Sequence, residues 1–294
     1  MRWNKITLVG VGLLGGSLGL ALRRRKLAKE IAGYVRREAS IKDCERAGAT
    51  DYATTDLLAA VSGADLVVLC TPLAQMKPIV KQMLPALKRG AIVTDVGSVK
   101  ASVVKDVEAL IHKAGAHFVG SHPMAGGEKQ GVLAARADLF GCAVCVVTPT
   151  RKTNPAALRK VETLWKDVGA RLLCTSPDKH DALVSRSSHL PHLMAATLAN
   201  LVLDPKLPKE QAKLCATGFR DTTRVASGSP EMWRDIALTN RKHIARTLTR
   251  FMADLGKFQT ALKRNDSKAI AKFFEAAKQR RDNWCACCAS PSSE

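Results

Sequence analysis

The chain has 294 residues, of which 46% are hydrophobic, which is enough for about two domains with packed cores. No apolar run approaches the ~20 residues of a membrane-spanning helix, so we expect no membrane partner. The formal net charge of +20 would suit nucleic acid, but the basic residues are spread along the chain and aromatic residues make up only 4% of it. We therefore expect a basic surface that attracts small anionic ligands, and no nucleic-acid partner.

Residues 1–4 lead directly into the first predicted strand, so we expect no signal peptide and a cytoplasmic protein. The nine cysteines are scattered and odd in number, which does not suggest a disulfide framework. Cys285, Cys287 and Cys288 lie close together, but without a Cys-x-x-Cys pair or a neighbouring histidine. We predict an oxidisable tail there and no metal site.

The first predicted elements are a strand over residues 6–9 and a helix over residues 18–22. Between them, Gly10, Gly12 and Gly15 have the G-x-G-x-x-G spacing of a dinucleotide-binding turn. In such a turn the first glycine allows a tight bend, the second lets a pyrophosphate approach the backbone, and the third lets the helix pack closely on the strand. A tight strand–helix turn without a ligand is the alternative.

Strands and helices then alternate up to residue 176. The further predicted strands cover residues 30–36, 64–71, 91–96, 117–120, 142–147 and 171–174, and the predicted helices between them cover residues 39–47, 75–87, 100–114 and 155–168. Strands that alternate with helices of this length indicate an α/β fold, a Rossmann-type domain with a mainly parallel sheet.

From residue 177 to about residue 283 the sequence has only helical periodicity. We therefore predict a dinucleotide-binding Rossmann domain over residues 1–176, an all-helical substrate and dimerisation domain over residues 177–284, and a disordered tail over residues 285–294. Helices without a sheet must bury their apolar faces on each other or on a second copy. A homodimer through the helical domain follows as a prediction.

The end of the second predicted strand bears on the choice of nucleotide. Rossmann domains usually place an acid there, about 20 residues after the glycines, to bind the ribose 2′-hydroxyl. Here Val35 stands at that position, and the guanidiniums of Arg36 and Arg37 follow it and suit a 2′-phosphate. We predict NADP in preference to NAD; two solvated arginines are the alternative, and Glu38 could support NAD. The predicted cofactor-binding residues are Gly10, Gly12, Leu13, Leu14, Gly15, Arg36, Arg37, Thr71, Pro72 and Ser98.

Two stretches that follow strands carry polar groups at the edge where such sheets bind ligands. Ser98 lies between a predicted strand and a predicted helix, where it could bind a ligand or cap the helix. His122 follows the strand 117–120 in a loop rich in glycine and proline. Imidazole is the natural base to take a hydroxyl proton while hydride leaves the same carbon. We predict that His122 is catalytic, although a lone histidine is more often structural.

Histidines and an arginine also stand out in the helical part. His189 and His192 are three residues apart and share a helix face, and Pro191 between them should kink the helix. His180 is about half a turn out of phase with His189 on a straight helix and is predicted to be structural. Further on, Arg224 could clamp a carboxylate or form a surface ion pair with a neighbouring aspartate.

Six motifs occur in one order along the chain. They are the glycine-rich turn at 10–19, Thr-Asp-Val-Gly-Ser-Val-Lys at 94–100, Ser-His-Pro-Met-Ala-Gly at 121–126, Ser-His-Leu-Pro-His at 188–192, Gly-Phe-Arg-Asp-Thr-Thr-Arg at 218–224, and Trp233. In this order they resemble the prephenate/arogenate dehydrogenase family of tyrosine biosynthesis, over residues 6–283. The resemblance implies a Rossmann domain followed by a helical dimerisation domain.

The resemblance also implies an activity and roles for residues. The reaction would be oxidative decarboxylation of prephenate or arogenate, to 4-hydroxyphenylpyruvate or tyrosine, with hydride transfer to NAD(P)+. His122 resembles the catalytic histidine that binds the ring hydroxyl, and Ser98 resembles the serine beside it. Arg224 resembles the arginine that binds the ring carboxylate. The predicted substrate-binding residues are His189, His192, Arg224, Glu128, Asp221 and Trp233. The chain departs from the family at Val35, where many members have an acid.

Two other functions remain open at this stage. One is another two-domain NADP-dependent enzyme, such as a hydroxyacid dehydrogenase or an imine reductase, although these lack the Ser-His-Pro-Met-Ala-Gly loop. The other is a non-enzymatic module that senses NADPH, which would bind the cofactor without turnover. The sequence does not distinguish prephenate from arogenate as the substrate.

Overall fold

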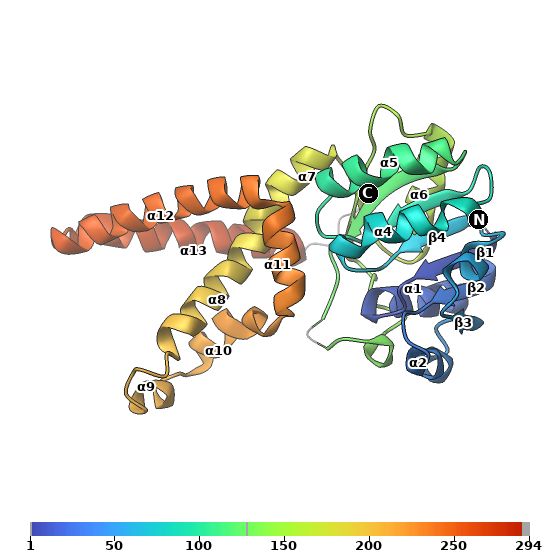
Figure 1. Ribbon diagram of the computed structural model, residues 1–294. Coiled ribbons are helices and arrows are strands. Elements are labelled where there is room, and N and C mark those ends of the chain that lie inside the picture. The colour runs from blue at the N-terminus through green and yellow to red at the C-terminus, as the bar shows by residue number, and fades with distance from the viewer. Residues whose placement is uncertain (1, 128, 290–294) are drawn as a thin grey trace. The chain divides into compact units, whose positions relative to one another are not determined.

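The computed structural model describes residues 2–127 and 129–289. The chain forms two compact units, Met1–Ile244 and Ala245–Glu294. The first unit contains the sheet, the helices that cover it and the first helices of the helical part. The second contains most of α12 and all of α13, with which the described residues end (Figure 1).

The first unit is organised around an eight-stranded sheet with the order β3-β2-β1-β4-β5-β6-β7-β8. The strands are β1 (Trp3–Val9), β2 (Ala28–Tyr34), β3 (Tyr52–Thr54), β4 (Leu66–Leu69), β5 (Ile92–Asp95), β6 (His117–Pro123), β7 (Val144–Thr148) and β8 (Arg171–Cys174). All neighbours are parallel except β6 and β7, which pair antiparallel. The predicted α/β class with a mainly parallel Rossmann-type sheet is confirmed.

Helices cover both faces of the sheet. One face packs against α1 (Leu13–Arg24), α2 (Ala39–Ala47) and α6 (Pro155–Asp167), and the other packs against α3 (Leu57–Val61), α4 (Leu73–Met83) and α5 (Ala101–Lys113). All four residues of β4 are buried, and successive side chains point to the two faces in turn. An apolar strand of this kind is typical of a sheet buried on both sides.

After β8 the chain is helical to the end of the described residues, as predicted. The elements are α7 (Pro177–Val184), the π-helical turn η3 (Ser185–His189), α8 (Leu190–Val202), α9 (Glu210–Lys213), α10 (Thr217–Thr223), η4 (Arg224–Ser227), α11 (Pro230–Thr239), α12 (Arg241–Lys263) and α13 (Ser267–Ala289). Short 3-10 turns lie at Leu84–Ala86 and Val132–Ala134. Within the second unit, the ring of Phe258 on α12 contacts the rings of Phe273 and Phe274 on α13.

Several element boundaries differ from the predictions. The strand β3 and the helix α3 were not predicted, because three and five residues are too short to establish a hydrophobic period. The predicted tail began at residue 285, but α13 continues to Ala289, since no glycine or proline interrupts it there. The rest of that predicted tail lies outside the described residues. Among those that are described, no helix is long and apolar enough to cross a membrane.

Candidate active site

The glycine-rich turn has the geometry that its spacing predicts. Gly10 has a φ of +97°, a conformation that favours glycine. A Cβ atom on Gly15 would lie 2.3 Å from the carbonyl oxygen of Gly10, so α1 packs too closely on the turn for any side chain. At Gly12 an added Cβ would meet no heavy atom within 4 Å. The turn therefore combines a tight bend and close helix packing with open space beside the backbone of Gly12.

The N-terminus of α1 suits an anion. Its N-cap is Gly12, which provides no side-chain cap, and its first turn contains no acidic residue. The N–H groups of this turn thus have no competing carboxylate, and the positive end of the helix dipole faces the same space. A diphosphate at this point would receive hydrogen bonds and a favourable field.

A cavity of about 490 Å³ lies at the carboxyl ends of β1, β2 and β4. Since strand order reverses between β1 and β4, this is the crevice where open α/β sheets bind ligands. Of the predicted cofactor-binding residues, Gly10, Gly12, Arg36, Arg37, Thr71 and Pro72 line this cavity, whereas Leu13, Leu14, Gly15 and Ser98 do not. The hydroxyl of Thr71 is buried there and has no partner in the described part of the chain. The cavity, this unpaired hydroxyl and the helix terminus fit a dinucleotide.

The second strand ends earlier than predicted. β2 stops at Tyr34, after which Val35 is buried while Arg36 and Arg37 are exposed. The two guanidinium side chains therefore lie beyond the strand rather than in it. They border the same cavity as Gly12, together with Ser40.

His122 lies inside a strand, which corrects its predicted position in a loop. We expected the strand to end at Gly120, because glycine and proline follow it. Instead β7 runs antiparallel to β6, and His122 is paired with Val146, so β6 continues to Pro123. The ladder with β7 therefore fixes the backbone of His122 at the ligand-binding edge of the sheet.

His122 contacts a second histidine that we predicted to be structural. Nδ1 of His122 lies 2.9 Å from Nε2 of His180, and Nδ1 of His180 lies 2.8 Å from Oδ1 of Asp181. Burial lowers the pKa of His122 well below its ordinary range, and the basic groups of His180 and Lys100 lower it further. His122 is therefore neutral at pH 7 and able to accept a proton. Helical periodicity relates only residues on the same helix, so it could not predict this contact between residues 58 positions apart.

A buried polar network supports the ends of β5 and β6. The ammonium of Lys100 is fully buried, pairs with the carboxylate of Asp95, and donates to the carbonyl oxygen of Ser121 at 2.8 Å. Asp95 also accepts from the backbone N–H of Ser121 at 3.1 Å and from that of Gly97 at 2.9 Å. Trp165 donates its indole N–H to the hydroxyl of Ser121 at 3.0 Å. Breaking such a fully paired buried network would leave a desolvated charge, so the residues beside Ser98 and His122 are held rigidly.

Ser98 does not cap α5, which was one of its two predicted roles. The N-cap of α5 is Lys100, and no side chain of the capping residue is used. The carboxylate of Asp181 accepts the N–H groups of Lys100 and Ala101 instead, at 2.7 and 2.9 Å. Ser98 lies half-buried in the bend between β5 and α5, which leaves the ligand-binding prediction for it open.

The helical part brings His189, His192 and Trp233 together. The rings of His192 and Trp233 are stacked with centroids 3.9 Å apart, and the ring of His189 meets that of Trp233 edge-on at 6.0 Å. Burial lowers the pKa of His189 to about 4, so it is neutral. The N–H of Trp233 and Nε2 of His189 are buried and lack a partner among the described residues.

A single asparagine ties this cluster to the histidine pair. Asn240 is buried, and its side-chain N–H groups face the carbonyl oxygen of Asp181 at 2.9 Å and Nδ1 of His189 at 3.1 Å. Because the amide donates, Nδ1 of His189 accepts, and the proton of neutral His189 is on Nε2. The unpaired atom of His189 is therefore an N–H donor, like that of Trp233.

Arg224 starts η4, which packs on α8, and it is close enough to His192 for its charge to lower the pKa of that histidine further than burial alone does. Asp221 is exposed on α10. Glu128 lies outside the described residues. Before Pro191 the helix is irregular: the chain passes through the π-helical turn η3 into α8, where Pro191 lies in the first turn and needs no N–H partner.

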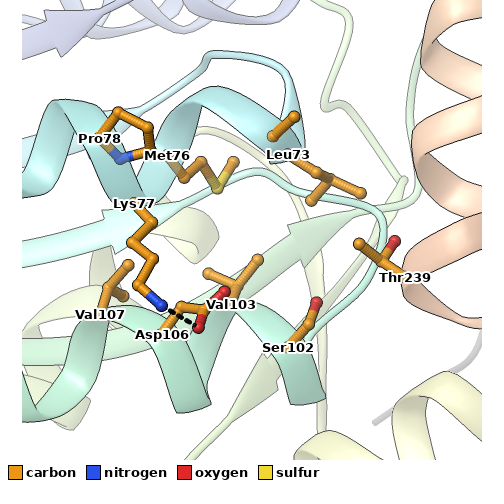
Figure 2. A pocket seen from close by; sticks show the side chains of 10 residues that line it. Leu73, Met76, Lys77, Pro78, Ser102, Val103, Asp106, Val107 and Thr239 are labelled. Carbon is orange, nitrogen blue, oxygen red and sulfur yellow. Dashed lines mark hydrogen bonds and ion pairs between the residues drawn. The ribbon is translucent and has the colours of Figure 1, made fainter.

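A second hollow, of about 290 Å³, lies between α4 and α5 and is bordered by Thr239 of α11 (Figure 2). Lys77 and Asp106 form an ion pair across it, with 2.8 Å between Nζ and Oδ1. None of the predicted cofactor, substrate or catalytic residues lines this hollow. It is therefore separate from the candidate active site.

The fold and the site together define a two-part dehydrogenase: a nucleotide cavity and a neutral histidine lie on the sheet, and nitrogen donors lie on the helices after it. Comparison with known proteins gives the same class. Residues 18–174 match the family model of the prephenate dehydrogenase nucleotide-binding domain, and residues 176–276 match that of the prephenate dehydrogenase dimerization domain. The chain belongs to the prephenate/arogenate dehydrogenase family, whose members are oxidoreductases of tyrosine biosynthesis.

Individual relatives cover almost the whole chain. Prephenate dehydrogenase of Bacillus subtilis is 33% identical over 95% of this chain and 76% of its own length. Cyclohexadienyl dehydrogenase of Zymomonas mobilis is 34% identical over 95% of each chain. The crystal structure of prephenate dehydrogenase from Aquifex aeolicus, in complex with hydroxyphenyl propionate and NAD+, superposes with a TM-score of 0.90 at 32% identity, covering 96% of this chain and 99% of that one.

Proposed function

We propose that this enzyme oxidatively decarboxylates prephenate, arogenate or both, with hydride transfer to NADP+ in preference to NAD+. One observation carries the proposal. Among the described residues, four buried side-chain polar atoms lack a partner, and three of them belong to Thr71, His189 and Trp233, which the sequence assigns to cofactor or substrate binding. An unpaired buried polar group costs about 1–3 kcal/mol, so a ligand that pairs with it is bound more tightly.

The reaction needs a base at the ring hydroxyl. Neutral His122 takes the hydroxyl proton, and the electron pair of the O–H bond forms the C=O bond as hydride leaves the same carbon. A bound nicotinamide supplies the hydride acceptor. The ring carboxylate then leaves as CO2, its electron pair makes the ring aromatic, and the phenolate oxygen recovers the proton from His122. General-base catalysis of this kind contributes about 10²–10⁴-fold.

The helical part supplies the groups for the anionic ends of the substrate. The guanidinium of Arg224 binds the ring carboxylate, for which its paired N–H donors have the right geometry. The free N–H groups of His189 and Trp233 donate to the other polar end of the substrate. Both prephenate and arogenate offer a carboxylate there, so this arrangement serves either compound.

Arg36 and Arg37 support NADP. Both line the nucleotide cavity beyond β2, and the buried Val35 offers no carboxylate to the ribose. We expect kcat/KM to be higher with NADP+ than with NAD+, and the double substitution R36A/R37A to lower it at least about tenfold for NADP+ only, since each charge-assisted bond is worth ~1.5–3 kcal/mol. A higher kcat/KM with NAD+ in the unaltered protein would contradict this preference.

A homodimer through the helical part is also proposed. Leu201, Leu214 and Leu238 are 68%, 78% and 60% exposed in the single chain, and helices without a sheet must bury such side chains on each other or on a second copy. The match to a dimerization domain supports a second copy as the partner. Light scattering should give twice the mass of the chain; a mass of one chain at every concentration would reject the dimer. The cytoplasmic location stays a prediction.

The proposal is tested with purified protein, prephenate or arogenate, and NADP+ or NAD+, in all four combinations. Formation of reduced nicotinamide is followed by absorbance, and the aromatic product is identified by chromatography. We expect turnover in at least one combination with NADP+. Cofactor binding without turnover of either substrate would instead favour a sensing module.

A further inference from the structure

Three side chains form a hydrogen-bonded series that ends at His122. The series runs from Asp181 through His180 to His122, with separations of 2.8 and 2.9 Å between the bonded atoms. The exposed fractions of these residues are 2%, 1% and 9%. His122 lies on β6 at the ligand-binding edge of the sheet, whereas His180 and Asp181 lie on α7.

Both carboxylate oxygens of Asp181 accept backbone N–H groups. Oδ1 accepts the backbone N–H of Lys100 at 2.7 Å and Oδ2 accepts that of Ala101 at 2.9 Å. Both donors belong to the start of α5, whose 13 residues place the positive end of the helix dipole at this carboxylate. Both carboxylate oxygens of Asp181 therefore act as hydrogen-bond acceptors in this structure.

A carboxylate at this position fixes where the protons of both histidines lie. Because Asp181 can only accept, Nδ1 of His180 must donate to it, and Nε2 of neutral His180 carries a lone pair. That lone pair can only accept, so Nδ1 of His122 must donate in turn. The proton of neutral His122 is therefore on Nδ1, and Nε2 is left without a proton.

We propose that Asp181 and His180 are positioning residues that hold His122 in the form whose bare Nε2 takes the substrate hydroxyl proton, and that they share the positive charge that His122 then gains. The sharing of charge during turnover rests on the proposed function, whereas the position of the proton on His122 is a property of the free protein. In the mechanism above the series acts twice: it presents the base before hydride leaves, and it stabilises the imidazolium until the phenolate oxygen recovers the proton.

The other charged groups around His122 neither fix the position of its proton nor stabilise its imidazolium form. The ammonium of Lys100 is paired with the carboxylate of Asp95, and His189 is neutral, with Nδ1 bound to Asn240. Asp181 is therefore the carboxylate that His180 connects to His122 by hydrogen bonds. The titratable groups packed around His122 and this network are Asp95, Lys100, Cys145, His180, Asp181 and His189.

The first test is direct and needs no substrate. Nitrogen NMR of protein with ¹⁵N-labelled histidine distinguishes protonated from bare ring nitrogens, and the signals of His122 are identified by their loss in His122→Asn. We expect Nδ1 to be protonated and Nε2 to be bare in the free protein at pH 7. A proton on Nε2 would overturn the proposal, whether or not the protein turns over prephenate.

The second test removes the charge but keeps the shape. In Asp181→Asn we expect kcat to fall at least about 100-fold, the KM values for substrate and cofactor to change little, and the acid limb of the kcat profile to move to lower pH, because the imidazolium loses its counter-charge. The matched control is Asp178→Asn, the same change on α7, where the side chain is 80% exposed and pairs with His243. An Asp181→Asn protein with unchanged kcat and pH profile would contradict the proposal.

The third test separates positioning from stability, because Asp181 also caps α5. His180 makes no bond to α5, so we compare His180→Leu, which removes the acceptor, with His180→Gln, whose carbonyl can accept from Nδ1 of His122. We expect kcat of His180→Leu to fall about as far as that of Asp181→Asn, and His180→Gln to restore part of it. Equal kcat in the two variants would reject a role of the acceptor.

Discussion

The sheet and the helices that follow it differ in how completely they bury their own apolar side chains. Nearly every apolar residue of β1, β4 and β5 is buried. After residue 176, by contrast, the buried hydrophobic residues of the described part are only Val184, Ala195 and Ile236. The sheet therefore has a complete core of its own, whereas the helices leave apolar faces that the proposed second copy would cover.

The same contrast holds for the site. The sheet contributes backbone geometry and one neutral base, which are fixed by ladder hydrogen bonds and by the buried pair of Lys100 and Asp95. The helices contribute the N–H groups of His189 and Trp233 and the guanidinium of Arg224. We therefore expect damage on the sheet side to abolish chemistry, and damage on the helical side to weaken substrate binding. The predictions below test this division.

The largest effect is expected from the base itself. His122→Asn should lower kcat by about 10²–10⁴-fold, because an amide cannot take the hydroxyl proton. Binding of the cofactor, measured by fluorescence titration, should change little, since His122 does not line the nucleotide cavity. Near-normal turnover in this variant would remove His122 from the mechanism.

The next largest effect concerns stability in acid. Burial lowers the pKa of His189 from 6.5 to about 4, so between these pH values the unfolded chain binds a proton there that the folded chain does not. The contribution of neutral His189 to the free energy of unfolding is present in full above pH 6.5. It should fall by up to about 3 kcal/mol as the pH drops to about 4. His122 acts in the same direction. Urea unfolding at several pH values measures the slope, and His189→Gln should make it shallower; an equal slope in that variant would contradict the assignment.

On the helical side, Arg224→Ala should act mainly on substrate binding. Loss of a charge-assisted pair is worth about 1.5–3 kcal/mol, so we expect KM for the substrate to rise about 10–100-fold. Turnover at saturation should fall much less than in His122→Asn. Steady-state kinetics distinguish the two, and a loss confined to kcat would place Arg224 in the chemical step instead.

The smallest effects come from two glycines. Gly15→Ala should cost about 1–3 kcal/mol and weaken cofactor binding, because its Cβ would overlap a backbone oxygen of the glycine-rich turn. Gly256→Ala, on α12, meets nothing within 4 Å and should be neutral or stabilise the protein by up to about 1 kcal/mol. Thermal unfolding of both variants measures the difference; equal stabilities would mean that the turn can relax.

Features that depend on residues close together in the sequence could be predicted, and features that depend on distant segments could not. The turn at Gly10, Gly12 and Gly15 follows from a strand, three glycines and a helix within twenty residues, so its geometry was predictable. The position of His122 depends on β7, which begins more than twenty residues later and pairs antiparallel. Nothing near His122 indicates that partner, so glycine and proline suggested a loop.

Buried polar contacts between distant segments were the least predictable part of the site. A lysine is rarely buried, yet Lys100 is fully buried because the carboxylate of Asp95 pairs with it. His180 was assigned a structural role from its phase relative to His189 on a straight helix. The π-helical turn between them changes that phase, and the resemblance to a known family did not include His180.

The π-helical turn η3 also constrains how this chain can change in length. A π turn accommodates one more residue than an α turn, so deleting a single residue from Ser185–His189 would leave a regular helix. Everything after the deletion would keep about its present rotation relative to His180, so His192 would still face Trp233. One residue can therefore be lost within η3 while the two parts of the site stay aligned, whereas the same deletion in the regular helix between His180 and η3 would turn everything after it by about 100°.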